Sequence, residues 1–154
     1  MSPNLTGKVC VVTGGSQGIG KGIALQLGAC GAIVYITGRN KTNLEKAAQE
    51  IKERGAQSVI PLSVDHSNDD DVRRLFDTVK NGQNGKLDVL VNNAYSGVNA
   101  IMENMGKPFW ESNPYELWDC INGVGLRNHY CCTALASRFE ATCKNRYYCL
   151  HLSF

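Results

Sequence analysis

Short apolar runs alternate with amphipathic stretches along the first 92 residues of the chain. Four runs rich in β-branched residues predict strands at 8–13, 32–36, 58–64 and 87–91. Between these runs, apolar residues recur every three or four positions, which is the period of a helix. This alternation predicts an α/β fold with a doubly wound parallel sheet and helices on both faces.

Each predicted helix has an apolar stripe and a recognisable boundary. The helices are expected at about 18–30, at about 42–54 and after Ser67. Ser67 is the expected N-cap of the third helix, because aspartates follow it and carboxylates suit the first turn. Gly31 and Gly55 are placed to end the first two helices. The predicted stripes are Ile19, Ile23, Leu27 and Cys30, then Leu44, Ala47, Ala48 and Ile51, then Val72, Leu75, Phe76 and Val79.

The pattern is weaker in the rest of the chain. Residues 114–136 are expected to be helical in part, and the tail 144–154 shows no strand-like alternation. Large apolar residues between 96 and 112 would either line a substrate cleft or pack as core or lid residues. They are Met102, Met105, Phe109 and Trp110.

A glycine-rich turn follows the first predicted strand directly. It reads Thr13-Gly14-Gly15-Ser16-Gln17-Gly18-Ile19-Gly20 and leads into the first helix. Glycines allow a tight turn and a close approach to a bound group, and the helix N-terminus attracts anions. A strand, a glycine turn and a helix in this order predict a pyrophosphate site. The loops after the other predicted strands converge on the same edge of a parallel sheet.

Composition limits the possible functions. The chain has 154 residues, which suits one domain, and its net charge of +2 gives no case for a nucleic-acid partner. The seven cysteines are odd in number and contain no C-x-x-C pair, so we expect reduced thiols and no metal site. The N-terminus is short and polar, unlike a signal peptide, and no apolar run approaches the ~20 residues of a membrane span. We expect a cytoplasmic protein, or one peripheral at an intracellular membrane in its full-length form.

Three motifs together resemble the short-chain dehydrogenase/reductase family. They are Thr13-Gly14-x-x-x-Gly18-Ile19-Gly20, Asp65 after the third strand, and Asn92-Asn93-Ala94 after the fourth. The resemblance covers about 8–139. It implies a Rossmann-type fold and hydride transfer between a nicotinamide cofactor and a carbonyl or alcohol substrate.

The resemblance implies a role for each matching residue. Gly14, Gly18 and Gly20 match the family's phosphate-turn glycines, and Ser16, Gln17 and Ile19 line that turn. Asp65 matches the acid that contacts the adenine, and Asn93 and Ala94 match the segment beside the cofactor ribose. The alternative for Asn92 and Asn93 is that they only tie neighbouring strands together.

Arg39 favours NADP(H) over NAD(H). An NAD site places a carboxylate at the end of the second strand, where this chain has Thr37 and Gly38. A guanidinium one residue later can pair with a 2′-phosphate. The alternative is an arginine that is simply exposed in a loop.

The chain departs from the family in its catalytic residues. Gly125-Leu126-Arg127-Asn128 aligns with the family's Asn-Leu-x-Gly, so the catalytic asparagine is absent. No tyrosine has a lysine four residues later, so the family's Tyr-x-x-x-Lys is absent too. We therefore assign no catalytic residue and expect this form to be inactive, with a C-terminally incomplete sheet.

The sequence divides into a cofactor-binding half, 1–139, and a tail, 140–154, that does not match the family. Shifted by one nucleotide, codons of the tail can encode a strand that ends in serine, so we interpret the tail as frameshifted or mis-spliced. Without a fifth strand, the fourth becomes an exposed edge. We therefore expect a marginally stable protein.

Two other functions fit parts of the sequence. The segment from Gly15 to Lys21 nearly matches the phosphate loop of nucleotide triphosphatases, although Gly22 stands where serine or threonine would hold Mg²⁺. The chain could also be a non-enzymatic fragment that holds cofactor or pairs with another subunit. Such pairing, including homo-oligomerisation, is expected through residues 114–139.

Overall fold

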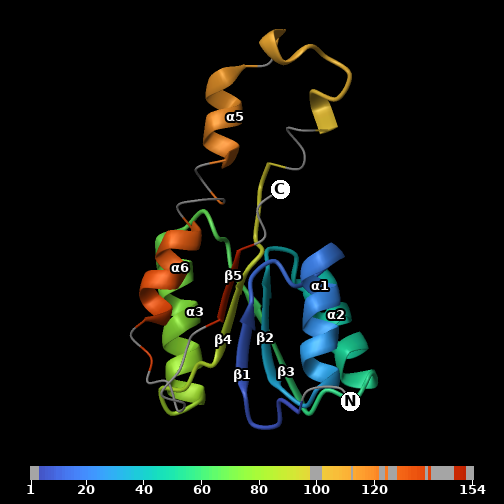
Figure 1. The fold of residues 1–154 in the computed structure, drawn as a ribbon, viewed down its shortest axis with the longest axis vertical. Coiled ribbons are helices and arrows are strands. Elements are labelled where there is room, and N and C mark those ends of the chain that lie inside the picture. Colours follow the sequence, from blue (N-terminus) through green and yellow to red (C-terminus); the bar gives the residue numbers. More distant parts are fainter. Residues whose placement is uncertain are drawn as a thin grey trace.

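The computed structural model describes residues 4–97, 102–111, 113–121, 124, 128–137, 139 and 148–151. Strands and helices alternate along most of this length (Figure 1). Their order is β1 (Val9–Val12), α1 (Gly18–Ala29), β2 (Ile33–Gly38), α2 (Lys41–Glu53), β3 (Ser58–Ser63), α3 (Asp69–Gly82), β4 (Val89–Asn92), η1 (Phe109–Glu111), α5 (Pro114–Ile121), α6 (Asn128–Ala136) and β5 (Tyr148–His151).

The strands form one sheet in the order β3-β2-β1-β4-β5. Every neighbouring pair is parallel. The chain therefore starts in the middle of the sheet, builds outward to β3, and then crosses to β4 on the other side of β1. This arrangement confirms the prediction of a doubly wound parallel sheet, and it puts the switch point between β1 and β4.

Helices cover both faces of the sheet, with α1 and α2 on one side and α3 and α6 on the other (Figure 1). Alternate residues of β1 serve the two sides. Val9 and Val11 belong to the core beneath α3 and α6, whereas Cys10 and Val12 belong to the core beneath α1 and α2. A strand buried on both faces needs a continuous apolar run, which explains the composition of β1.

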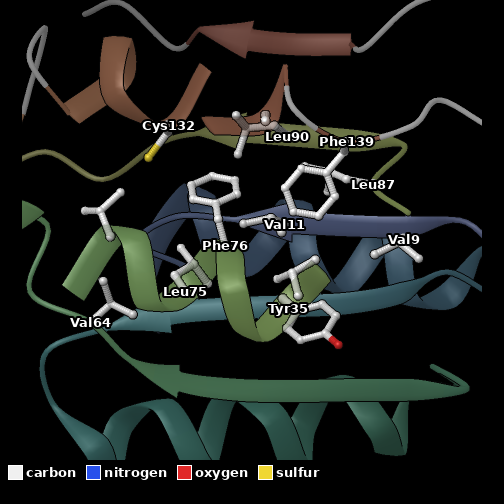
Figure 2. Close-up of a cluster of buried hydrophobic side chains, with 13 residues drawn as sticks. Val9, Val11, Tyr35, Val64, Leu75, Phe76, Leu87, Leu90, Cys132 and Phe139 are labelled. Carbon is white, nitrogen blue, oxygen red and sulfur yellow. The ribbon is translucent and has the colours of Figure 1, made fainter. Parts of the chain in front are cut away.

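The core beneath α3 and α6 is built around aromatic side chains (Figure 2). The Phe76 ring of α3 meets the Phe139 ring edge to face, with centroids 6.1 Å apart and planes at 66°. The four stripe residues predicted for α3 are buried, and so are the four predicted for α2. Both stripes are thereby confirmed.

The buried face of α1 differs in part from the prediction. Of the predicted stripe, Cys30 is buried, and Ile23 and Leu27 are partly buried against the core beneath α1 and α2. The residues buried in this helix are Gly20, Ala24 and Gly28, whereas Ile19 is 53% exposed. A Cβ on Gly28 would lie 2.7 Å from the Cβ of Ala56, so α1 packs closer than an apolar stripe would permit. The inner face of this helix therefore combines closely packed small residues with part of the predicted apolar stripe.

The N-cap of α3 is Asn68 and not Ser67. The Asn68 side chain accepts hydrogen bonds from the backbone N–H groups of Asp70 and Asp71. Ser67 instead donates through both its N–H and its hydroxyl to the Asp65 carboxylate. The predicted N-cap was wrong by one residue, because the side chain of Ser67 bonds to Asp65 and not to the first turn of α3.

The tail supplies the fifth strand, which the sequence pattern did not indicate. Tyr148–His151 pairs in parallel with Val89–Asn92 over the full length of β4. Strand β4 is therefore interior, so the expectation that it forms an exposed edge was wrong, and β5 takes the outer position. Backbone hydrogen bonding can recruit a segment without amphipathic alternation when its partner strand is already in place.

Residues 102–111 and 113–121, which we call the arm, rise beyond the carboxyl edge of the sheet (Figure 1). Trp110, Tyr115 and Trp118 are 72%, 80% and 67% exposed. Met102 and Met105 are also exposed, so they are not core residues, and the Phe109 side chain lies outside the described residues. Within the described part of the chain, no helix is both long enough and apolar enough to cross a membrane.

Candidate functional site

A pocket of about 510 Å³ lies at the carboxyl edge of the sheet, where the loops after β1, β2, β3 and β4 converge. All ten cofactor-binding residues expected from the sequence line it: Gly14, Ser16, Gln17, Gly18, Ile19, Gly20, Arg39, Asp65, Asn93 and Ala94. The cofactor roles of these residues stay predictions. Their positions around one pocket agree with a parallel sheet, in which the loops after the strands meet at one edge.

Further lining residues were not expected. They are Gly38, Val64, His66, Ser67, Tyr95, Ser96, Asp119 and Val124. Most of them are chain neighbours of the expected residues, and this adjacency is the signal that could have found them. Asp119 comes from α5 in the arm, and no sequence signal links it to the strand-end loops. Met102, Met105 and Trp110 do not line the pocket.

The glycine turn owes its shape to two left-handed residues. Gly14 has φ +67° and Gly18 has φ +57°, a region that favours glycine. A Cβ on Gly14 would lie 2.9 Å from Asn93 Nδ2, whereas one on Gly18 would meet nothing within 4 Å. Gly14 therefore packs against the protein, and Gly18 borders open space in the pocket.

The N-terminus of α1 is open to the pocket. Helices α2 and α3 have their first amides bonded by the side chains of Asn40 and Asn68. Gln17, at the N-cap of α1, makes no such bond, and the first turn of α1 contains no acid. This helix end has backbone donors and a positive dipole directed at a pocket lined by glycines, which suits a phosphate group.

Asn93 ties the β4 loop to the glycine turn. Its Nδ2 donates to the backbone oxygens of Thr13, at 2.9 Å, and Gly14, at 3.1 Å. The buried Thr13 hydroxyl accepts from the backbone N–H groups of Asn93 and Ala94, each at 2.9 Å. A Cβ on Gly20 would collide with Asn93 Nδ2 and the Gly14 carbonyl, so α1 closes onto the same junction.

Asn92 has a different structural contact. It is buried at the end of β4, and its Nδ2 donates to the Thr133 hydroxyl of α6 at 3.3 Å. Asn92 and Asn93 thus both tie elements together. Of the two, Asn93 alone also lines the pocket.

A second tie joins the ends of β1, β2 and β3. The Thr37 hydroxyl accepts from the Gly14 N–H at 3.2 Å and lies 2.6 Å from His66 Nε2. The Thr37 carbonyl accepts from the Gly15 N–H at 2.9 Å. The glycine turn is therefore bonded on one side to the β4 loop and on the other side to β2.

Charge is concentrated around Asp65. Hydrogen bonds from the Ser67 hydroxyl and N–H lower the pKa of the Asp65 carboxyl, and the charge of Arg39 and that of His66 add to this effect. Burial opposes these causes without outweighing them. Asp65 therefore carries a negative charge at neutral pH, with the exposed Arg39 close enough to act on it.

The alternative of a nucleotide triphosphatase loop finds no support in the position of Lys21. Its Nζ lies 2.8 Å from Glu50 Oε2 of α2, and Lys21 does not line the pocket. The hydrogen bond from Lys21 lowers the pKa of the Glu50 carboxyl. The lysine thus serves an ion pair between two helices.

Comparisons with known proteins agree with the fold and the motifs. The family model described as short chain dehydrogenase matches residues 8–139. Dehydrogenase/reductase SDR family member 1 of Homo sapiens is 52% identical over 138 residues, which make up 90% of this chain and 44% of the human protein. This chain therefore spans less than half the length of that relative.

The crystal structures that are similar to the chain include two short-chain dehydrogenases or oxidoreductases. A short chain dehydrogenase from Mycobacterium thermoresistibile matches with a TM-score of 0.81 and 26% identity, over 97% of this chain and 52% of that one. A metagenomic short-chain oxidoreductase in complex with NADP matches with a TM-score of 0.73 and 34% identity, over 86% and 56% of the two chains. With a family match over residues 8–139 and the motifs gathered at one sheet edge, the chain belongs to the short-chain dehydrogenase family.

Proposed function

We propose that this chain binds NADP(H) in the pocket at the carboxyl edge of its sheet. The observation that carries the proposal is the uncapped N-terminus of α1, which meets the glycine turn beside open space at Gly18. This part of the pocket would hold the pyrophosphate, with Asn93 and Ala94 beside the ribose. The metagenomic relative solved with NADP supports the same class of ligand. When bound, the nicotinamide supplies the hydride chemistry.

Arg39 supports NADP(H) over NAD(H). The last residues of β2, Thr37 and Gly38, are buried, and neither is a carboxylate that could bind ribose hydroxyls. Arg39 follows them at the pocket wall, where its guanidinium can pair with a 2′-phosphate. The Asp65 carboxylate beside Arg39 would compete for the same cation, so the preference depends on both residues.

We assign oxidoreductase activity to a longer form of the protein and not to these 154 residues. Because the aligned residues make up only 44% of the human relative, we propose carbonyl or alcohol oxidoreduction for a full-length form. For these 154 residues we propose cofactor binding without turnover, since no tyrosine is followed by lysine four residues later. Without that pair, no group matches the one that exchanges a proton with substrate in the family. Pairing with a second subunit through residues 114–139 is part of the same proposal.

Titration of the purified chain with NADPH and NADH tests the cofactor. We expect tighter binding of NADPH, and loss of most of the difference in Arg39→Ala, because a charge-assisted pair contributes ~1.5–3 kcal/mol. Arg54→Ala is the matched control, since Arg54 is an exposed arginine at the end of α2 and does not line the pocket. Equal affinity for the two cofactors in the unmodified chain would contradict the role of Arg39.

Turnover separates the enzyme from the binding fragment. We expect no NADPH oxidation with a panel of aldehydes and ketones, although NADPH binds. Steady oxidation that depends on protein and substrate would refute inactivity, and Tyr95, which lines the pocket, is then the first acid to replace with phenylalanine. Light scattering at several protein concentrations tests the association.

A further inference from the structure

The glycine turn is connected by hydrogen bonds to His66, which lies outside the turn. His66 lies in the loop after β3, is 7% exposed, and lines the pocket. Its Nε2 lies 2.6 Å from the hydroxyl of Thr37, which is fully buried. That hydroxyl accepts the N–H of Gly14. One chain of hydrogen bonds thus runs from the β3 loop through β2 to the turn after β1.

The hydroxyl of Thr37 can serve both neighbours because it has two lone pairs and one hydrogen. One lone pair receives the Gly14 N–H. With neutral His66 unprotonated at Nε2, the hydroxyl donates to the imidazole; with a proton on Nε2, the hydroxyl accepts from it. In either case the imidazole fixes the rotamer of Thr37. It thereby fixes the oxygen that holds the Gly14 amide.

The charged groups that act on or bond to the Asp65–His66 segment come from three parts of the chain. Asp65 precedes His66 in the same loop, Arg39 comes from the end of β2, and Asp71 of α3 accepts a hydrogen bond from the Asp65 N–H. The Asp65 carboxylate accepts hydrogen bonds from the N–H and the hydroxyl of Ser67. Protonation of the imidazole would force Nε2 to donate, so the Thr37 hydroxyl would then share its lone pairs between His66 and Gly14.

We propose that His66 is a positioning residue for the cofactor: through the Thr37 hydroxyl it holds the Gly14 amide and thereby the glycine turn in the shape that receives the pyrophosphate. This inference rests on the proposed binding of NADP(H). It assigns His66 no contact with reacting atoms.

The first test follows the relay without any cofactor. In ¹⁵N-labelled protein, the amide resonance of Gly14 is expected to shift with pH at the same midpoint as the His66 ring. The shift is expected to vanish in His66→Gln and in Thr37→Val. In addition, His66→Leu is expected to displace the Gly14 resonance at neutral pH. A Gly14 amide that neither follows the His66 titration nor moves in His66→Leu would overturn the proposal.

The second test measures affinity for NADPH. His66→Leu and Thr37→Val are each expected to weaken binding about tenfold, the equivalent of one hydrogen bond of ~1.4 kcal/mol. His66→Gln and Thr37→Ser are expected to restore most of the affinity, because both retain a polar group at the required position. The double variant His66→Leu/Thr37→Val is expected to bind no more weakly than Thr37→Val alone, since both changes break one relay.

Tyr35→Phe is the matched control. It removes a hydroxyl from the same strand, one that accepts from Gln83 Nε2 at 2.9 Å away from the pocket. It is expected to leave both NADPH affinity and the Gly14 resonance unchanged. If His66→Leu unfolds the protein, Thr37→Val and Thr37→Ser carry the comparison, because both are close in volume to threonine.

The outcomes separate the two proposals. Additive losses in the double variant, or unchanged affinity in Thr37→Val, would overturn the positioning role while leaving cofactor binding intact. If unmodified protein binds neither NADPH nor NADH although the Gly14 amide follows His66, the proposed function fails. The positioning role then fails with it, and only the hydrogen-bond relay stands.

Discussion

The strand-end loops and the arm contribute to the same pocket, but they are held in different ways. On the side of the sheet, Thr13, Thr37 and Asn93 form a network of hydrogen bonds above two packed cores. On the side of the arm, Trp110, Tyr115 and Trp118 face solvent. The loops therefore form a shaped pocket within this chain, whereas these three aromatic side chains of the arm are not buried in a core.

This difference separates two requirements of an oxidoreductase, a site for the cofactor phosphates and a site for the substrate. A phosphate site requires backbone groups held in place before the ligand arrives, and the strand-end loops provide this. A substrate site requires walls that exclude water. The exposed side chains of Trp110, Tyr115 and Trp118 do not line the pocket, so these three residues provide no such wall.

The largest effect expected at the pocket comes from crowding the junction of α1 with the strand-end loops. Gly20→Ala puts a Cβ against the backbone of Gly14 and the amide of Asn93. We expect a loss of ~3 kcal/mol in the free energy of unfolding, at the upper end for overpacking, together with loss of cofactor binding. Urea denaturation and NADPH titration measure the two effects.

Gly22→Ala is the matched control, because Gly22 lies in the same helix, is exposed, and has no atom within 4 Å of an added Cβ. Alanine is the better helix former by ~1 kcal/mol, so this variant should be slightly more stable than the unmodified chain. Equal stability of the two variants would mean that α1 does not need its close approach to the turn.

These glycines mark the limit of what the sequence could predict. The stripes of α2 and α3 were predictable because large apolar residues recur at helical spacing and bury directly. The burial of Gly20, Ala24 and Gly28 in α1 was not predictable, because these residues have almost no hydrophobic signal and their burial depends on what they approach. The site followed the same rule. The motif residues line one pocket, as expected, although their roles stay predictions. The adjacency of His66 to Asp65 could have placed it near the pocket, but no residue spacing in the sequence indicates its hydrogen bond with Thr37.

The fifth strand was not predicted from the sequence, for a related reason. Tyr148–His151 has no alternation, and its place is decided by the backbone groups of β4. Its role in the sheet could not be predicted from its own residues. We still interpret the tail as a frameshifted or mis-spliced segment, and transcript sequence across residues 140–154 tests this. A clean in-frame reading with unrelated codons would contradict it.

A medium effect is expected at the amino edge of the same sheet, where Asp88 ties β4 to β1. Its carboxylate accepts from Lys8 Nζ and from the Val9 N–H, each at 2.9 Å. Burial raises the pKa of Asp88, but these hydrogen bonds together with the charge of Lys86 outweigh it and hold the pKa below the ordinary 3.8. Asp88→Asn should cost ~1–2 kcal/mol at pH 7, as measured by urea denaturation.

The pH dependence of this cost has a definite sign. Because the pKa is lower in the folded state than in the unfolded state, the stabilisation is present above pH 3.8 and is lost as pH falls through the lowered value. The stabilities of the unmodified chain and Asp88→Asn should therefore converge in acid. Asp70→Asn, in an exposed pair with Arg73, is the control and should change little. A gap that persists in acid would point to packing as its cause.

The smallest effect is expected in the arm. Trp118→Ala removes a large side chain that is 67% exposed, so we expect a change within ~0.5 kcal/mol by thermal or urea unfolding. Leu75→Ala in α3, at 1% exposed, is the buried counterpart and should cost ~2–5 kcal/mol. Comparable losses at the two positions would show that the arm has a packed environment in solution.

The small residues of α1 also bear on the order in which the chain folds. Four of the twelve residues of this helix are glycine, and each costs ~1 kcal/mol relative to alanine, so the isolated segment would not be helical. Its contacts at Gly20 exist only after β1 and the β4 loop have come together. Helix α1 should therefore form after the folding transition state, so that destabilising it speeds unfolding more than it slows folding. A ligand bound at the N-terminus of α1 would then mainly lower the rate of unfolding.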